Sequence, residues 1–393
     1  MCTSGIYSYV VNHSKNKLMK YLFVLTLLFV VQLTGCKLEN NENVFSAQNL
    51  LDRYYVNHPE MIGLMVHIEA PDKSISWSGA VGLANKNDTI LIQHDQPANI
   101  ASNTKTYVSA TILRLVEQGK LSLENPINTL ISETSRKTLI IDNYDLAKIK
   151  VKHLLSHTSG IFNYVNSETY NDRILTAPKH KWTRDEQIKL AVNEGEPMGE
   201  PQEMYGYSDT NYLLLSEIIE GLTGKPFYTA IRDLLNFKKH ELNSTWFIGL
   251  EDELVDTKSL IYQYAEETNT YKEDPSFDLF GGGGLASTTR DLAIFMHQLF
   301  TGGIFTKPET SKLLLTKLTL KNGEKYNYHL GLRKYDISGK VAYGHTGFYG
   351  TYACYIPEDN ISISIFVSNA DVKKKKFIAE FKEDLLKEIN RIK

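Results

Sequence analysis

Cysteine is scarce in this sequence, with three copies among 393 residues. One of them lies at position 2, ahead of a hydrophobic leader, so only Cys36 and Cys354 would remain in a mature chain. If Cys36 carries a lipid, as its surroundings predict below, no disulfide can form within the chain. A disulfide-stapled fold is therefore excluded, and Cys354, on an apolar stretch, is predicted to be a small buried hydrophobe.

An excess of charge of either sign is also lacking. The sequence holds 43 Lys and Arg against 46 Asp and Glu, a formal net charge of −3. No strong basic excess and no known binding motif indicates a nucleic-acid partner, so none is predicted.

Motifs for several other chemistries are missing. His153 and His157 are four apart, but the glutamate of H-E-x-x-H and a third ligand are lacking, so we predict a structural role and no metal. The glycines at 281–284 are not followed by Gly-Lys-Ser/Thr, which favours a tight turn beside the cleft over a phosphate loop. The G-x-S-x-G elbow of α/β-hydrolases is absent. No cofactor is predicted.

One hydrophobic run stands out near the start. Residues 21–33 are almost wholly apolar and follow Lys15, Lys17 and Lys20. The run would reach about 20 Å as a helix, too short for a bilayer core of roughly 30 Å, and it fits a secretory signal that begins at Met1 or Met19. It ends in "LTGC", which resembles a bacterial lipoprotein signal cleaved before a lipidated Cys36. An ordinary cysteine behind an ordinary signal is the alternative.

These features predict three regions. Residues 1–35 form a signal peptide, residues 36–49 a flexible tether, and residues 50–393 one folded domain. The mature protein would be exported and lipid-anchored to a bacterial membrane, on the periplasmic face or the cell surface.

The hydrophobic pattern predicts an α+β fold. Residues 63–84 read as two half-buried strands joined by a turn at Pro71-Asp72-Lys73, and four strands follow from about residue 326 to 370. Between them, residues of about 125–284 read as mostly helical, and apolar residues at helical spacing end the chain. We therefore expect an antiparallel sheet formed by the N- and C-terminal segments, flanked by helices, with a helical region inserted.

The segment "PANIASNTKTYVSAT" places Ser102 and Lys105 three residues apart where a strand turns into a helix. On a helix the two side chains are neighbours. A serine hydroxyl becomes a nucleophile when a base takes its proton, and a lysine can be that base if its pKa is lowered. Serine is also a common helix N-cap, and the same S-x-x-K spacing occurs at Ser14 and Lys17, so the pair alone is weak.

Two later motifs could supply partners. "YGYSDTNY" contains Tyr207, a phenol that could act as a base beside a lysine, and Asp209; a packed aromatic and a helix cap are the alternatives. "YGHTGFYG" contains His345 on a predicted strand. The lack of a side chain at Gly347 would let a substrate approach the backbone. The amides of Phe348 and Ser102 could together hold an oxyanion.

Ser102-x-x-Lys105, Tyr207-x-Asp209 and His345-Thr346-Gly347 resemble, in this order, the three motifs of the penicillin-recognising serine hydrolases. The branch they are most similar to is that of the class C β-lactamases, with D-alanyl-D-alanine carboxypeptidases, D-aminopeptidases and esterases. Similar flanking segments extend the resemblance over about residues 50–390.

The resemblance implies roles for these residues. Ser102 would form the acyl-enzyme, and Lys105 and Tyr207 would share proton transfer. Asp209 stands where Asn is more common, and could orient Lys105. His345 stands where many β-lactamases carry Lys; because histidine is only partly charged near neutral pH, this favours a peptidase or esterase. The predicted catalytic residues are Ser102, Lys105, Tyr207 and His345. The predicted substrate-binding residues are Asp209, Thr346, Gly347 and Phe348.

The sequence thus predicts a serine hydrolase of peptide, amide or ester substrates, with D-amino-acid peptides of cell-wall type as the leading class. A β-lactamase or esterase of the same family is the first alternative, and a non-catalytic sensor of cell-wall fragments is the second. The natural substrate and the oligomeric state stay open.

Overall fold

The computed structural model describes residues 47–392, except 88, 253–256, 266–267 and 371. The predicted signal peptide, Cys36 and most of the tether lie outside these residues. The helices are α2 (Ala47–Asn57), α3 (Thr104–Glu117), α4 (Glu133–Ile141), α5 (Val151–Leu155), α6 (Glu168–Thr176), α7 (Arg184–Asn193), α8 (Thr210–Thr223), α9 (Phe227–Leu234), α10 (Thr289–Phe300), α11 (Pro308–Leu314) and α12 (Val372–Arg391). None of these described helices has both the length and the apolarity to cross a membrane.

Six antiparallel strands form the main sheet, in the order β2-β1-β11-β10-β9-β8. They are β1 (Gly63–Ala70), β2 (Ile75–Gly82), β8 (Arg333–Ile337), β9 (Lys340–Thr346), β10 (Thr351–Ile356) and β11 (Ile361–Val367). The N-terminal hairpin pairs with the last strand of the C-terminal meander, Val66 facing Ile365. The predicted α+β fold, with one sheet built from both ends of the chain, is confirmed.

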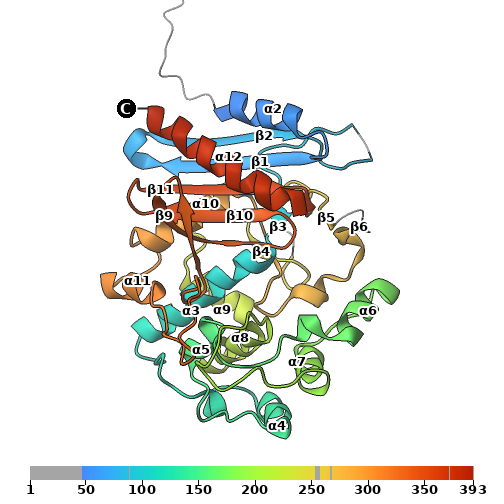
Figure 1. Cartoon of the computed structure of the whole chain (residues 1–393), viewed down its shortest axis with the longest axis vertical. Coiled ribbons are helices and arrows are strands. Elements are labelled where there is room, and N and C mark those ends of the chain that lie inside the picture. The colour runs from blue at the N-terminus through green and yellow to red at the C-terminus, as the bar shows by residue number, and fades with distance from the viewer. Residues whose placement is uncertain (1–46, 88, 253–256, 266–267, 371, 393) are drawn as a thin grey trace, which may run out of the picture. The chain divides into compact units, whose positions relative to one another are not determined.

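Helices cover both faces of this sheet. α10 contacts β1, β10 and β11, and α2 contacts β1 and β2. α12 runs across the sheet beside α2 (Figure 1), where Lys382 lies 5.2 Å from the ring centre of Tyr352 on β10. Cover on both faces buries nearly every residue of β1, so the expectation of a half-buried first strand was wrong for β1.

The helical region lies below the sheet in Figure 1, with α3 between the two. The remaining strands are short: β3 (Ala98–Asn99), β4 (Trp246–Phe247) and β7 (Leu285–Ser287) form one small sheet, and β5 (Tyr264–Ala265), β6 (Thr268–Asn269) and β12 (Asn369–Ala370) another. α8 is followed by Gly224, whose φ of 65° is the left-handed conformation that glycine favours after a helix. β3 leads into α3 at the boundary between sheet and helices, and this junction carries Ser102.

Candidate active site

Ser102 lies in a strained turn between β3 and α3. Ala101, just before it, has φ of 45°, which a residue with a Cβ rarely adopts. The Ala101 N–H donates to Asn99 Oδ1 at 2.9 Å, and Asn103 Nδ2 donates to the Ile100 carbonyl at 3.2 Å. Both ends of the turn are therefore fixed, and the serine is held at its corner.

Ser102 is not the cap of α3. The capping position belongs to Asn103, whose side chain makes no capping bond. The Ser102 hydroxyl instead accepts a hydrogen bond from Lys105 Nζ at 3.0 Å. The ordinary explanation for a serine at a helix start does not apply here.

Lys105 is completely buried, and its ammonium group contacts three other groups. Besides Ser102, it donates to the Gly282 carbonyl at 2.5 Å and forms an ion pair with Asp209. Burial alone lowers the pKa of Lys105, but attraction to Asp209 and to Tyr207 outweighs burial and raises this pKa above its ordinary value. The condition under which the sequence analysis allowed Lys105 to act as a base, a lowered pKa, is not met in the folded protein, because the carboxylate of Asp209 stands beside it.

Tyr207 completes the cluster around the serine. Its ring centre lies 5.1 Å from Lys105 Nζ, and its hydroxyl is close enough to Ser102 and Lys105 for both to influence the pKa of the phenol. Burial raises the pKa of Tyr207; Lys105 lowers it and Asp209 raises it, and the net direction is upward. The phenol is therefore protonated at rest.

The segment of Tyr207 and Asp209 is held by residues around position 160. The Ser208 N–H donates to His157 Nδ1 at 3.2 Å, and the His157 ring packs on Tyr207 with centroids 4.2 Å apart. The Asp209 N–H donates to Asn163 Oδ1 at 3.0 Å. Asp209 is the first residue before α8 but makes no side-chain capping bond, since its carboxylate faces Lys105.

His153 and His157 make separate contacts: His153 Nδ1 accepts from the Lys150 N–H, and His157 Nδ1 accepts from the Ser208 N–H. Among the residues that the structure describes, no three His, Cys, Asp or Glu side chains are grouped so that they could hold a metal ion. The lowered pKa of His157, caused first by burial and then by Lys105 and His345, keeps its ring neutral. Its role as a support for Tyr207 was not visible in the sequence, because the two residues are 50 positions apart.

His345 lies on β9, with 1% of its surface exposed. Its Nδ1 is 2.7 Å from the Thr346 carbonyl, which can only accept, so Nδ1 carries the proton. Its Nε2 therefore accepts from the Tyr328 hydroxyl at 3.0 Å. Burial first, then Arg333 and Lys105, lower the pKa of His345 well below its ordinary value. The histidine is neutral, not partly charged as the sequence suggested.

Arg333 supplies the fixed positive charge that His345 lacks. It begins β8 and pairs with Gly344, the neighbour of His345 on β9. Its guanidinium lies 5.3 Å from the ring centre of Tyr207 and 5.2 Å from that of Tyr328. Sequence reasoning missed this residue, although its place opposite the His-Thr-Gly strand in the meander was a usable signal.

Gly347 meets the serine turn from the other side. A Cβ at Gly347 would lie 2.3 Å from the Ile100 carbonyl oxygen and 2.2 Å from Thr351 Oγ1. Glycine is required here because the chain itself packs against it, whereas the sequence suggested room for a substrate. Thr346 is exposed, and Phe348 has 67% of its surface exposed and packs on Tyr349 with ring centroids 5.3 Å apart.

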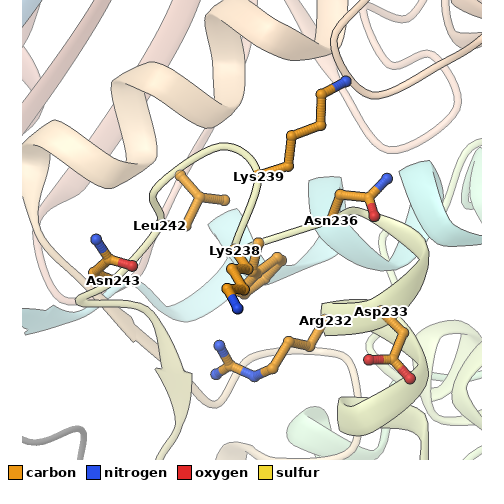
Figure 2. Close-up of a pocket in the computed structure, with 8 residues that line it drawn as sticks. Arg232, Asp233, Asn236, Lys238, Lys239, Leu242 and Asn243 are labelled. Atoms are coloured by element: carbon orange, nitrogen blue, oxygen red, sulfur yellow. The ribbon is translucent and has the colours of Figure 1, made fainter.

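A hollow of about 360 Å³ lies elsewhere, after α9 (Figure 2). Its lining contains no serine, histidine or tyrosine, and one of its charged lining residues, Arg232, is engaged by Glu251 and the Thr245 carbonyl. Lys238 and Lys239 are exposed at its rim. This hollow is separate from the cluster around Ser102 and offers no hydrolytic chemistry.

The fold and the contact of a serine with a buried lysine define the class of protein, a serine hydrolase. More particularly, the chain belongs to the β-lactamase family, whose model, described as Beta-lactamase, matches residues 51–386.

Individual relatives are distant. The chain is 24% identical to a putative D-alanyl-D-alanine carboxypeptidase of Escherichia coli (strain K12), with 82% of each chain covered. It is 24% identical to penicillin-binding protein 4* of Bacillus subtilis (strain 168), covering 77% of this chain and 67% of the relative. A D-stereospecific amidohydrolase from Streptomyces sp. has a similar structure, with TM-score 0.70 and 23% identity over 83% of this chain and 96% of that one. At this identity a similar structure shows the fold alone.

Proposed function

We propose that the protein hydrolyses small peptide, amide or ester substrates through an acyl-enzyme on Ser102, with D-amino-acid peptides of cell-wall type as the leading class. The observation that carries the proposal is the 3.0 Å contact between Lys105 Nζ and Ser102 Oγ inside a buried cluster. The names of the relatives support the substrate class, since they include a D-alanyl-D-alanine carboxypeptidase and a D-stereospecific amidohydrolase.

The charge state of the cluster dictates the first proton transfer. Lys105 and Tyr207 both hold their protons at rest, so neither can accept the serine proton directly. Asp209 is in contact with Lys105 and is the acceptor at hand. Lys105 passes one proton to Asp209, takes the proton of Ser102, and the serine oxygen attacks the acyl carbon.

The second half of the reaction returns these protons. As the bond between the acyl carbon and the leaving nitrogen or oxygen breaks, Tyr207 protonates the leaving atom and regains a proton from Lys105, which recovers its own from Asp209. The amides of Ser102 and Phe348 hold the negative oxygen of the tetrahedral intermediate, a contribution of about 3 kcal/mol per donor. A water then releases the acyl group by the same steps in reverse.

Arg333 favours a substrate with an acidic group near the scissile bond. Burial lowers the pKa of Arg333, but the surrounding tyrosines, Tyr205 and Tyr328 foremost, raise it above its ordinary value, so the charge is permanent. A peptide carboxylate would pair with it. The carboxylate of a β-lactam would do so equally, which keeps β-lactamase activity as the second candidate.

A mass measurement with a labelled penicillin tests the proposal. The protein from about residue 40 is incubated beside Ser102→Ala and, as a matched control, Ser122→Ala, which changes an exposed serine. A stable adduct on wild type and on the control, absent in Ser102→Ala, supports a slowly deacylating peptidase, and rapid turnover supports a β-lactamase. If no adduct forms and simple esters are also untouched, the proposal fails and a non-catalytic sensor becomes the better hypothesis.

We further propose that Cys36 carries the lipid that anchors the protein to a bacterial membrane. The support is the leader at residues 21–33 and the "LTGC" that follows it. Cys36→Ser should move the protein from the membrane fraction to the soluble fraction after cell lysis. A variant that still sediments with membranes would contradict lipidation.

A further inference from the structure

A second carboxylate lies beside the glycine row of the active site. Asp278 ends the short 3-10 helix Pro275–Asp278, and a Cβ on Gly283 would lie 2.2 Å from Asp278 Oδ2. The carboxylate therefore touches the backbone at Gly283. The preceding residue, Gly282, provides the carbonyl that accepts from Lys105. Asp278 is thus one residue along the backbone from a direct contact of the catalytic lysine.

Asp278 has no counter-ion of its own. Its carboxylate makes no hydrogen bond or ion pair with any residue that the structure describes. Lys105 attracts it from a distance but is in contact with Asp209. Asp278 as a residue is intermediate in exposure, neither fully buried nor fully open to solvent. A partly buried acid without a partner is rare and calls for a ligand.

Two phenols reach the residue just before this acid, since Tyr164 Oη and Tyr170 Oη both donate to the Phe277 carbonyl. Burial is the main cause that raises the pKa of Tyr164, Tyr170 and Tyr349, and the charge of Asp278 adds to the rise at each of them. All three stay neutral and offer no compensating charge. Aromatic rings beside a carboxylate suit an ammonium group, which gains from the ring electrons as well as from the ion pair.

The backbone that carries Asp278 is firmly held. The Phe277 carbonyl accepts from Tyr170 Oη at 3.0 Å, from Tyr164 Oη at 3.4 Å and from Gln187 Nε2 at 2.9 Å. The protein thus fixes the position of a carboxylate that it leaves without a partner. Such positioning is expected of a binding group rather than of a structural acid.

We propose that Asp278 binds a protonated amino group of the substrate, so that the enzyme prefers acyl donors whose α-amine is free. The class comprises D-amino acid amides, D-aminoacyl esters and peptides whose amino-terminal residue is a D-amino acid. The inference rests on the proposed function, because it takes Ser102 to be the residue acylated.

The preference should depend on pH. Burial raises the pKa of Asp278 to about 7; Lys105 lowers it and Asp209 raises it. The acid is therefore ionised above about pH 7, and an α-ammonium group keeps its proton below about pH 8. Both charges coexist between these values, so the preference should be greatest there and should weaken toward pH 6.

Two substrates with one leaving group test this, D-alanine p-nitroanilide and its N-acetyl derivative. In wild type we expect kcat/KM to favour the free amine about 10- to 100-fold, the range of a charged hydrogen bond. Asp278→Asn should bring the ratio near one, mainly by raising KM for the free amine. Glu133→Gln removes the same charge from an exposed site that is paired with Lys137, and should leave the ratio unchanged.

The outcomes separate the two proposals. Equal rates on both substrates in wild type, or a ratio that survives in Asp278→Asn, overturn the role of Asp278 while Ser102 chemistry stands. A ratio that does not change between pH 6 and 7.5 also counts against it, because a merely structural role would not respond to ionisation. If wild type cleaves neither substrate and no penicillin adduct forms, the proposed function fails as well.

Discussion

Asp209→Asn offers the sharpest test of the charge state deduced for the active site. In the wild type, Asp209 forms an ion pair with Lys105, whose side chain is fully buried, while 13% of the Asp209 side chain is exposed. Removing one partner of a buried ion pair destabilises a protein by about 3–5 kcal/mol. The amide oxygen of asparagine still accepts a hydrogen bond, so we expect a smaller loss, roughly 2–3 kcal/mol, in the free energy of unfolding measured with urea.

The same substitution should reshape the pH profile of catalysis. If the substitution removes about 2–3 kcal/mol of stabilisation from the charged form of Lys105 relative to its neutral form, the pKa of Lys105 falls by about two. The asparagine side chain of this variant cannot accept a proton, so the variant can react only through the small fraction of neutral Lys105. We expect log(kcat/KM) for an ester to rise with a slope near one between about pH 6 and 9, whereas the wild type stays flat.

The direction of the profile decides the matter. If kcat/KM of Asp209→Asn falls with rising pH, the reaction needs the lysine cation and the proposed relay through Asp209 is wrong. A flat profile that matches the wild type would falsify the idea that Asp209 sets the proton state of Lys105. Glu217→Gln, a buried acid on α8 that is bonded to Ser135, is a control for the general loss of a buried carboxylate.

Three further predictions follow from the contacts. Tyr328→Phe removes the donor to the buried His345 Nε2 and should lower the free energy of unfolding by about 1–3 kcal/mol in urea titration; no change would mean that this nitrogen has another partner. Gly347→Ala puts a Cβ 2.3 Å from the Ile100 oxygen, so it should cost roughly 1–3 kcal/mol and slow acylation in stopped-flow, and wild-type rates would contradict that packing. Burial raises the pKa of Asp278 in the folded protein from 3.8 to about 7. The contribution of its protonated form to the free energy of unfolding is therefore fully present below pH 3.8, and it is lost as the pH rises through 7. At pH 8 the free energy of unfolding of Asp278→Asn, measured with urea, should therefore exceed that of wild type by up to about 2 kcal/mol for this partly exposed group, whereas at pH 4 the two should be equal. An equal difference at both pH values would refute this prediction.

The fold class and the identity of the central residues could be predicted from local sequence. Alternating apolar residues and a turn at Pro71-Asp72-Lys73 located the first hairpin, because strand periodicity is a local property. The order of the Ser102, Tyr207 and His345 motifs identified the family, since each motif is a short stretch of chain.

The charges of the site, in contrast, depend on how the chain folds. Lys105 is a cation because Asp209, 104 residues away, is in contact with it, and His345 is neutral because it is buried near Arg333. Asp278 lies in a segment with no motif, and nothing local announces that its carboxylate meets Gly283. A pKa depends on burial and on groups brought close by folding, so no spacing along the chain could have given these proton states.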